Sequence, residues 1–164
     1  TTSPTSGSFT INRNFNHPVE RVFKAFSDPA AKTKWFTGPM GGETLERVIE
    51  VKTGGSEVLK FKHPSGMITH FIAKYHAVES GKRIVYSYDL MINGKHHSTS
   101  LAVVEFMPAG KNTAMIFTEH VAWHDGTELS KGLASREHGT SWHHSGVISP
   151  CSAAVSPQTM APSI

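Results

Sequence analysis

A succession of short apolar segments, separated by turns, is the feature that most constrains the fold of this chain. Six such segments follow one another in the central half of the sequence: 45–51, 57–63, 67–78, 83–92, 98–107 and 113–123. The clearest turn is Asn93-Gly94, because both residues tolerate the positive φ of a two-residue hairpin. Connections this short join antiparallel strands, since a parallel crossover needs about a dozen residues. The sequence therefore predicts an antiparallel meander.

One strand and two short helices are predicted ahead of the meander. Residues 9–15 alternate between apolar and polar side chains, which is the period of a half-buried strand. The first helix is expected to have Pro18 in its first turn, with Asn16 or His17 as its cap. Its apolar stripe comprises Val19, Val22, Phe23 and Phe26. Asp28-Pro29 ends this helix and starts a second one, because aspartate caps helices and proline fits the first turn.

A closing helix is predicted after the meander, from two leucines at positions 129 and 133. Gly132 and Gly139 each weaken it by roughly 1 kcal/mol relative to alanine. The apolar residues lose any period beyond residue 140, so we expect a short, atypical helix. Residues 141–164 are predicted to form an irregular tail rich in Ser, Pro and Ala, and residues 1–8 a flexible lead-in. The folded domain is then expected to span residues 9–140.

Composition excludes several classes of protein. A chain of 164 residues with 38% hydrophobic residues suits one folded domain. No run approaches the roughly 18 apolar residues of a membrane span, and the first residues show no signal-peptide pattern. The formal charge is +3, with 16 Lys and Arg spread along the chain, so no nucleic-acid partner is expected. The single cysteine, Cys151, fits a reducing compartment, and we expect a cytoplasmic protein without a membrane partner.

Several local motifs occur in the order typical of one protein family. They are a first strand and helix over 9–29, Lys34-Trp35-Phe36 before Gly38-Pro39, Thr53-Gly54-Gly55, the strand 83–88, and two last strands containing 104–106 and 112–120. In this order the sequence resembles the Aha1-like domains (activator of Hsp90 ATPase homologue) of the START/helix-grip (SRPBCC) superfamily. The resemblance implies an α+β helix-grip fold. In this fold a curved antiparallel β-sheet holds a C-terminal helix, with two short helices near the N-terminus.

A curved sheet that grips a helix leaves a concave apolar space, which is the default place for a ligand. The alternation of the strands predicts which side chains line it: Phe15, Tyr86, Tyr88, Phe106, Met115, Phe117 and Trp123, with Trp35 and Phe36 at the rim. Each of these could equally be a plain core residue. The two tyrosines are the most informative, because a buried hydroxyl needs a hydrogen-bond partner.

Two charged residues interrupt the apolar strand faces. Arg13 lies on the face of the first strand, and Glu119 on that of the last strand. A lone buried charge is costly, so one expectation is that the two pair. The alternatives are a structural ion pair, a strand-end arginine that reaches solvent, or a polar anchor that orients a ligand carboxylate or hydroxyl. The resemblance favours the anchor, because the matching positions of related domains face the cavity.

Motifs for other chemistry are weak. The sequence has no G-x-S-x-G element, and the segment 38–42 lacks the phosphate-loop pattern. His120 and His124 are four residues apart, but on a strand this spacing does not set a metal geometry. We therefore expect no cofactor and no metal, and the sequence identifies no catalytic residue.

The sequence favours one function over two alternatives. The first is binding of a small, mainly apolar molecule between the sheet and the C-terminal segment. One alternative is a co-chaperone-like interaction module with a chaperone as its partner, and the other is a cyclase- or hydrolase-type enzyme of the same superfamily. A homodimer is a further prediction, because an incompletely covered cavity exposes apolar surface.

Overall fold

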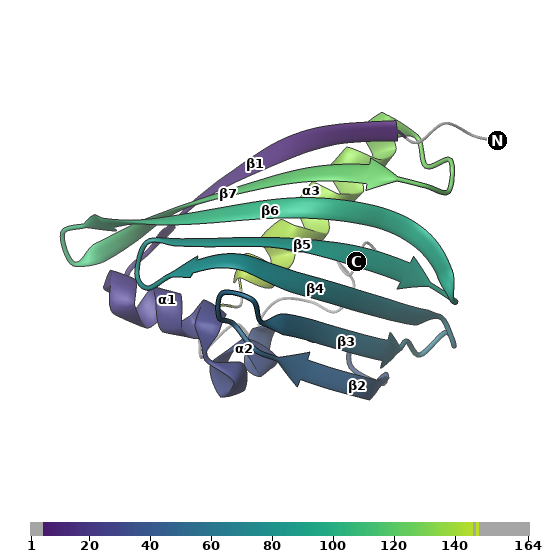
Figure 1. The fold of residues 1–164 in the computed structure, drawn as a ribbon, viewed down its shortest axis with the longest axis horizontal. Helices are drawn as coiled ribbons and strands as arrows, with labels where there is room; N and C mark the ends of the chain where they lie inside the picture. The colour runs from purple at the N-terminus through teal and green to yellow at the C-terminus, as the bar shows by residue number, and fades with distance from the viewer. Residues whose placement is uncertain (1–4, 146, 148–164) are drawn as a thin grey trace.

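Seven antiparallel strands form the sheet of the computed structural model, which describes residues 5–145 and 147 (Figure 1). The strands are β1 (Thr5–Phe15), β2 (Glu43–Ile49), β3 (Ser56–Lys62), β4 (Ile68–Glu79), β5 (Arg83–Ile92), β6 (Lys95–Ala109) and β7 (Asn112–Trp123). Their order in the sheet is β1-β7-β6-β5-β4-β3-β2. Strands β2 to β7 therefore lie in chain order, which confirms the predicted meander. β1 begins at Thr5, earlier than predicted, because it pairs with β7 as far as Trp123.

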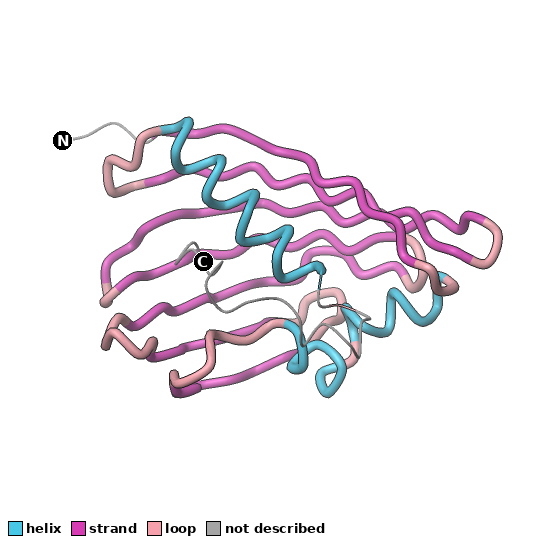
Figure 2. The backbone as a smooth tube through the Cα atoms, turned by 180° about the vertical axis from the view of Figure 1, so that it is seen from behind, coloured by secondary structure: helices cyan, strands magenta, loops and turns pink. Residues whose placement is uncertain are grey.

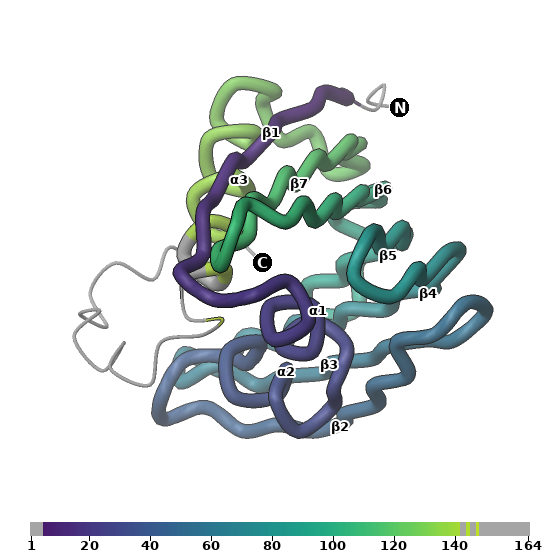
Figure 3. The backbone as a smooth tube through the Cα atoms, turned by 90° about the vertical axis from the view of Figure 1, so that its left-hand side faces the viewer, coloured from purple at the N-terminus to yellow at the C-terminus, as the bar shows by residue number. Residues whose placement is uncertain are grey.

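Three helices complete the described part of the chain: α1 (Val19–Ser27), α2 (Pro29–Trp35) and α3 (Leu129–Ser145). Seen from behind, α3 runs obliquely across one face of the sheet (Figure 2). Seen end-on, the sheet curves around the face that α3 covers, and α1 and α2 lie at one end of the sheet (Figure 3). The predicted α+β helix-grip fold is confirmed. No helix in the described residues has both the length and the apolar character that crossing a membrane requires.

Local turn and cap chemistry was predicted well with one exception. Asn93 and Gly94 have φ values of 50° and 76°, as the predicted hairpin turn requires. The Asp28 side chain accepts a hydrogen bond from the backbone N–H of Ala31 at 2.9 Å and caps α2 as expected. The predicted side-chain cap of α1 is wrong. Pro18 itself is the N-cap residue, with extended backbone and no side-chain cap hydrogen bond.

α3 continues beyond residue 140, where the sequence pattern predicted its end. One reason is a tertiary contact: Nη2 of Arg13 donates to the carbonyl and to the hydroxyl of Ser141, each at 3.0 Å. A positive charge near the C-terminal end of a helix is also favourable for the helix dipole. Of the predicted tail and lead-in, residues 1–4, 146 and 148–164 lie outside the described residues.

Gly132 allows α3 to lie directly on a buried ring. A Cβ atom at this position would be 2.8 Å from Cζ2 and 2.9 Å from Cε2 of Trp123. Trp123 is only 1% exposed, so its ring has no free space to move into. The glycine that weakens the helix by its intrinsic propensity is therefore required by the packing.

Gly132→Ala should lower the stability of the protein, although alanine is the better helix former. We expect a loss of roughly 1–3 kcal/mol in the free energy of unfolding, because the new methyl group overpacks against Trp123. Urea denaturation measures this loss. Glu137→Ala, at an exposed position of the same helix, is the control and should change stability by less than about 0.5 kcal/mol. A stabilised Gly132→Ala protein would contradict the packing argument.

Candidate functional site

A small pocket lies between the sheet and the helices. Its volume is about 50 Å³, which is room for a few water molecules or a small chemical group. Aromatic rings form most of its wall, and the lining residues are Phe26, Lys32, Trp35, Phe36, Phe71, Tyr75, Ile84, Tyr86, Tyr88, Val104, Phe117, Glu119, Arg136, Thr140 and His144. Phe36 and Tyr86 contact both buried clusters of the hydrophobic core. The pocket therefore lies where these two clusters meet.

A buried polar cluster, here called the Glu119 cluster, lies at one end of the pocket. It consists of Tyr88 on β5, Ser98 and Ser100 on β6, Glu119 on β7 and Arg136 on α3. Glu119 is 0% exposed and Arg136 is 4% exposed. The alternation of the three strands brings the polar side chains to the concave face, and α3 brings the guanidinium onto them. The cluster therefore joins the C-terminal helix to the centre of the sheet.

One carboxylate oxygen accepts three of the hydrogen bonds in the Glu119 cluster. Oε2 of Glu119 accepts from the Tyr88 hydroxyl at 2.8 Å, from the Ser100 hydroxyl at 3.0 Å and from Nη1 of Arg136 at 3.1 Å. Arg136 also donates to Tyr88 at 2.8 Å and to Ser98 at 2.8 Å. Oε1 of Glu119 is buried and has no hydrogen-bond partner among the described residues. One end of the pocket thus holds an unused acceptor.

Burial controls the protonation of the Glu119 cluster. It raises the pKa of the Glu119 carboxyl, although Arg136 and the hydrogen bonds oppose this change. It also raises the pKa of the Tyr88 hydroxyl, which stays protonated and donates to the carboxyl. Burial alone would lower the pKa of Arg136, but the contacts with Tyr88 and Glu119 outweigh it and raise that pKa. The arginine is therefore a permanent cation.

A second buried polar cluster, the Lys32 cluster, consists of Lys32 on α2, Glu57 on β3 and Tyr75 on β4. Nζ of Lys32 lies 2.6 Å from Oε2 of Glu57 and donates to the Tyr75 hydroxyl at 2.8 Å. The Tyr75 hydroxyl donates in turn to the same carboxylate oxygen. Burial and the nearby carboxylate raise the pKa of Tyr75. Lys32 and Tyr75 line the pocket, so the pocket wall contains a second cationic group besides Arg136.

Tyr86 lies between the two polar clusters. Its ring centroid is 5.5 Å from that of Tyr75 and 6.1 Å from that of Tyr88. The ammonium of Lys32 is 5.9 Å from the Tyr86 ring and 5.2 Å from the Phe36 ring. The Tyr86 hydroxyl makes no hydrogen bond to another described residue, and burial raises its pKa. A neutral phenol thus borders the middle of the pocket.

The structure brings six of the predicted ligand-binding residues to the pocket wall. These are Trp35, Phe36, Tyr86, Tyr88, Phe117 and Glu119. The other predicted residues, namely Phe15, Phe106, Met115, Trp123 and Arg13, are not part of the wall. Phe15, Phe106, Met115 and Trp123 are at most 8% exposed and belong to the packed core. Whether the pocket binds a ligand stays a prediction.

The predicted pairing of Arg13 with Glu119 is wrong. Arg13 lies on the edge strand β1, where its guanidinium binds Ser141 near the end of α3. Arg136, from the middle of α3, occupies the position beside the carboxylate. The prediction failed because strand alternation can identify only residues on strands as partners of Glu119, and it therefore pointed to Arg13. An arginine from a distant helix requires the tertiary structure.

Sequence reasoning missed Lys32, Glu57, Tyr75 and Arg136. Signals for two of them were present. Glu57 shares the strand face of Leu59 and Phe61, which are both buried. Arg136 is three residues after Leu133, so helical spacing places it on the same side of α3. In both cases a charged residue occupies a position where the strand or helix periodicity predicts an apolar residue.

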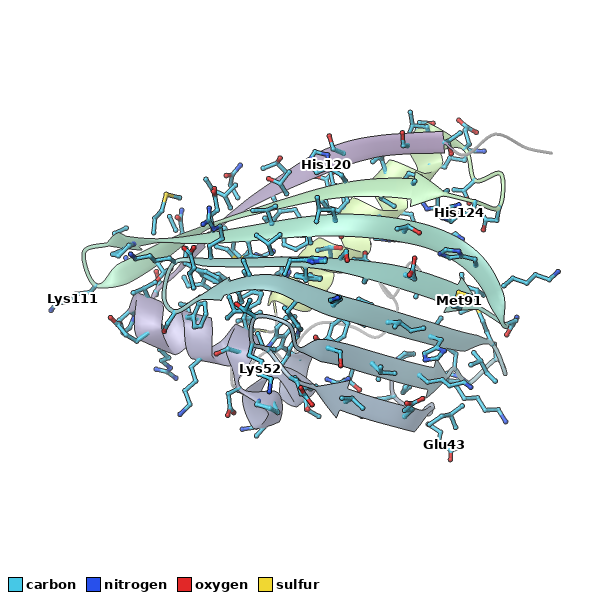
Figure 4. All side chains as sticks on the ribbon, viewed as in Figure 1. Glu43, Lys52, Met91, Lys111, His120 and His124 are labelled. Carbon is cyan, nitrogen blue, oxygen red and sulfur yellow. The ribbon has the colours of Figure 1, made fainter. Side chains whose placement is uncertain are left out.

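Within the described residues, the histidines do not form a group suited to a metal ion. No group of three His, Cys, Asp or Glu side chains in the described residues is arranged to hold a metal ion. His120 lies along β7, whereas His124 lies just past the end of this strand (Figure 4). His124 instead stacks on His96 at 4.2 Å and bonds to Thr99 at 2.9 Å. His97 contacts Asp125.

Comparison with known proteins gives a family and several similar structures. The family model described as "Activator of Hsp90 ATPase homolog 1-like protein" matches residues 16–147. A solved Rhizobium leguminosarum protein is 28% identical, with a TM-score of 0.82 over 88% of this chain and 93% of its own. The Mll3558 protein of Rhizobium loti is 32% identical, with a TM-score of 0.80 over 89% and 97% of the two chains. The CV1439 protein of Chromobacterium violaceum is 20% identical, with a TM-score of 0.65 over 85% and 93%, a likeness of fold alone. No curated protein matches.

Two arginine variants test which cation pairs with the buried carboxylate. Arg136→Met should lower the free energy of unfolding by roughly 3–5 kcal/mol, because it leaves Glu119 buried without its counter-ion. Arg13→Met removes only hydrogen bonds to Ser141 and should cost about 1–2 kcal/mol. Urea denaturation of both variants gives the comparison. A larger loss for Arg13→Met would overturn the assignment of Arg136.

Alkaline titration tests the burial of the pocket wall, because all three tyrosines of the chain, Tyr75, Tyr86 and Tyr88, line it. Their pKa values are raised in the folded protein above the unfolded value of about 10. The stability that they contribute is therefore complete below about pH 10 and is lost as the pH rises above it. Near-ultraviolet absorbance should show tyrosinate only when circular dichroism shows unfolding. A tyrosinate signal near pH 10 in the folded protein would contradict the buried arrangement.

Proposed function

We propose, since the chain belongs to the activator of Hsp90 ATPase homolog 1-like family, that it binds a small, mainly apolar ligand in the pocket under α3. The observation that carries this proposal is the combination of an aromatic wall with a fixed polar group at its end. Apolar burial supplies binding free energy at about 25 cal/mol per Å² of surface. A few polar groups then set the orientation of the ligand.

The Glu119 cluster supports this proposal because hydrogen bonds within the protein fix its geometry. Glu119 and Arg136 are held by hydrogen bonds to three other side chains. A ligand that enters therefore does not have to order these groups, and the entropic cost of binding is lower.

The single cysteine and the absence of a charge cluster agree with a cytoplasmic binding protein, which is part of the proposal.

The description of the family supports a second candidate, which is an interaction module for a chaperone of the Hsp90 type. Retention of purified Hsp90 on the immobilised protein would support this candidate. The absence of retention, together with small-molecule binding, would favour the first proposal.

A third candidate is an enzyme of the cyclase or hydrolase type. The buried carboxyl of Glu119 at the pocket supports it, because burial raises its pKa toward the range of a general acid or base. Turnover of a bound compound that collapses in Glu119→Gln, with binding retained, would support the enzyme.

A thermal-shift screen of single-ring aromatic compounds tests the proposed ligand binding. A compound present at 100 times its Kd should raise the melting temperature by roughly 5 to 10 °C, because it binds only the folded state. Val104→Phe fills the pocket and should abolish this shift. Val103→Phe is the matched control, since Val103 does not line the pocket, and it should leave the shift intact.

Two results would contradict the proposal. One is the absence of any shift across the screen. The other is a shift of equal size in the folded Val104→Phe variant, which would place the binding outside the pocket. Circular dichroism of both variants ensures that folded proteins are compared.

A further inference from the structure

We infer that the pocket recognises one neutral aromatic ring with a hydrogen-bond donor at one end and a carbonyl-type acceptor at the other. This inference rests on the proposed function, and it names the chemical class of the ligand. Three observations carry it: an unused acceptor, an unused donor and an aromatic wall between them.

The unused acceptor is Oε1 of Glu119. This residue is 0% exposed and lines the pocket, and Oε1 has no partner among the described residues. A buried acceptor without a hydrogen bond is costly, so a ligand that donates to it gains more than a hydrocarbon does. A phenolic hydroxyl is a donor of this kind. Arg136, Tyr88 and Ser100 hold the other carboxylate oxygen and therefore keep Oε1 free.

The unused donor is on Lys32. Its ammonium carries three N–H groups, and two of them are taken by Glu57 and Tyr75. The third has no acceptor among the described residues, and Lys32 lines the same pocket. Aromatic rings surround the ammonium and cannot accept a strong hydrogen bond. A carbonyl oxygen of the ligand supplies the missing acceptor.

The positions of Tyr86 and Tyr88 indicate the distance between the Lys32 ammonium and the Glu119 carboxylate. They are two residues apart on β5, about 7 Å along the strand, and their ring centroids are 6.1 Å apart. Lys32 lies over the ring of Tyr86, whereas Glu119 binds the hydroxyl of Tyr88. One aromatic ring with a polar group at each end spans a distance of this order. Its face can pack on these rings, as aromatic pairs in proteins do.

The charge and the volume of the pocket limit the chemical class of the ligand further. Glu119 is paired with Arg136 and Glu57 with Lys32, and the guanidinium of Arg47 also interacts with Glu57. A cationic ligand would add to the positive charge of Lys32 and Arg47, and an anionic ligand would lie against the buried carboxylate of Glu119, so a neutral ligand is favoured. The volume of about 50 Å³ is smaller than one aromatic ring needs, so the walls must widen even for a single ring, and a second ring would require a larger change.

Calorimetric titration with four related compounds tests the inference in the unmodified protein. 4-Hydroxyacetophenone has both polar groups, acetophenone lacks the donor, 4-ethylphenol lacks the acceptor, and 4-ethyltoluene lacks both. We expect 4-hydroxyacetophenone to bind about tenfold more tightly than either single-group compound, and about a hundredfold more tightly than 4-ethyltoluene. Val104→Phe is the control for binding inside the pocket.

Glu119→Gln tests the acceptor end. The amide oxygen can keep the hydrogen bonds from Arg136 and Tyr88, which turns the amide N–H₂ toward the pocket. In the unmodified protein 4-methoxyacetophenone should bind at least about tenfold more weakly than the hydroxyl compound. In the variant the two should bind within about threefold of one another. Lys32→Met should abolish the advantage of 4-hydroxyacetophenone over 4-ethylphenol and keep that of 4-ethylphenol over 4-ethyltoluene.

The outcomes separate this inference from the proposed function. Equal affinity for all four compounds overturns the inference and leaves the proposed function standing. Failure of all four to bind the folded, unmodified protein, together with the lack of any hit in the thermal screen, overturns both. If Lys32→Met does not fold, the four-compound series and Glu119→Gln still decide the question.

Discussion

The contact between Arg136 and Glu119 is the constraint on which the rest of the structure depends. The guanidinium comes from α3 and the carboxylate from β7, and Tyr88 and Ser100 bring β5 and β6 to the same point. A buried ion pair adds little net stability by itself, but breaking it leaves a buried charge alone. The pair therefore favours one register of α3 on the sheet, in which Arg136, Thr140 and His144 line the pocket.

The second polar cluster follows the same physical rule at the other end of the sheet. Lys32 and Glu57 are almost completely buried and form an ion pair, and the Tyr75 hydroxyl bonds to both of them. Both clusters lie beside aromatic side chains at the junction of two core clusters, where Phe36 contacts each. Polar groups in such a place limit the ways in which the rings can pack. The pocket thus lies beside two buried ion pairs, at the place where the two parts of the core meet.

Family and fold do not by themselves assign a ligand. The proteins of Rhizobium leguminosarum and Rhizobium loti share most of the length and fold of this chain, and the matching family model covers the sheet and the helices. Folds of this kind carry many functions, so the assignment has to come from the chemistry of the site. Here that chemistry consists of Glu119, Lys32 and the rings between them.

The sequence alone determined the features that depend on neighbours in the chain: the meander, the Asn93-Gly94 hairpin and the Asp28 cap, since periodicity and turn chemistry act over a few residues. Strand alternation likewise placed Glu119 on the inner face of its strand. Only the tertiary structure decided that Arg136 is its partner, and that α3 continues past residue 140. A short sequence pattern carries no information on which turn of a distant helix lies over the sheet. That choice is made by packing and by the pairing of buried charges, which exist only once the chain has folded.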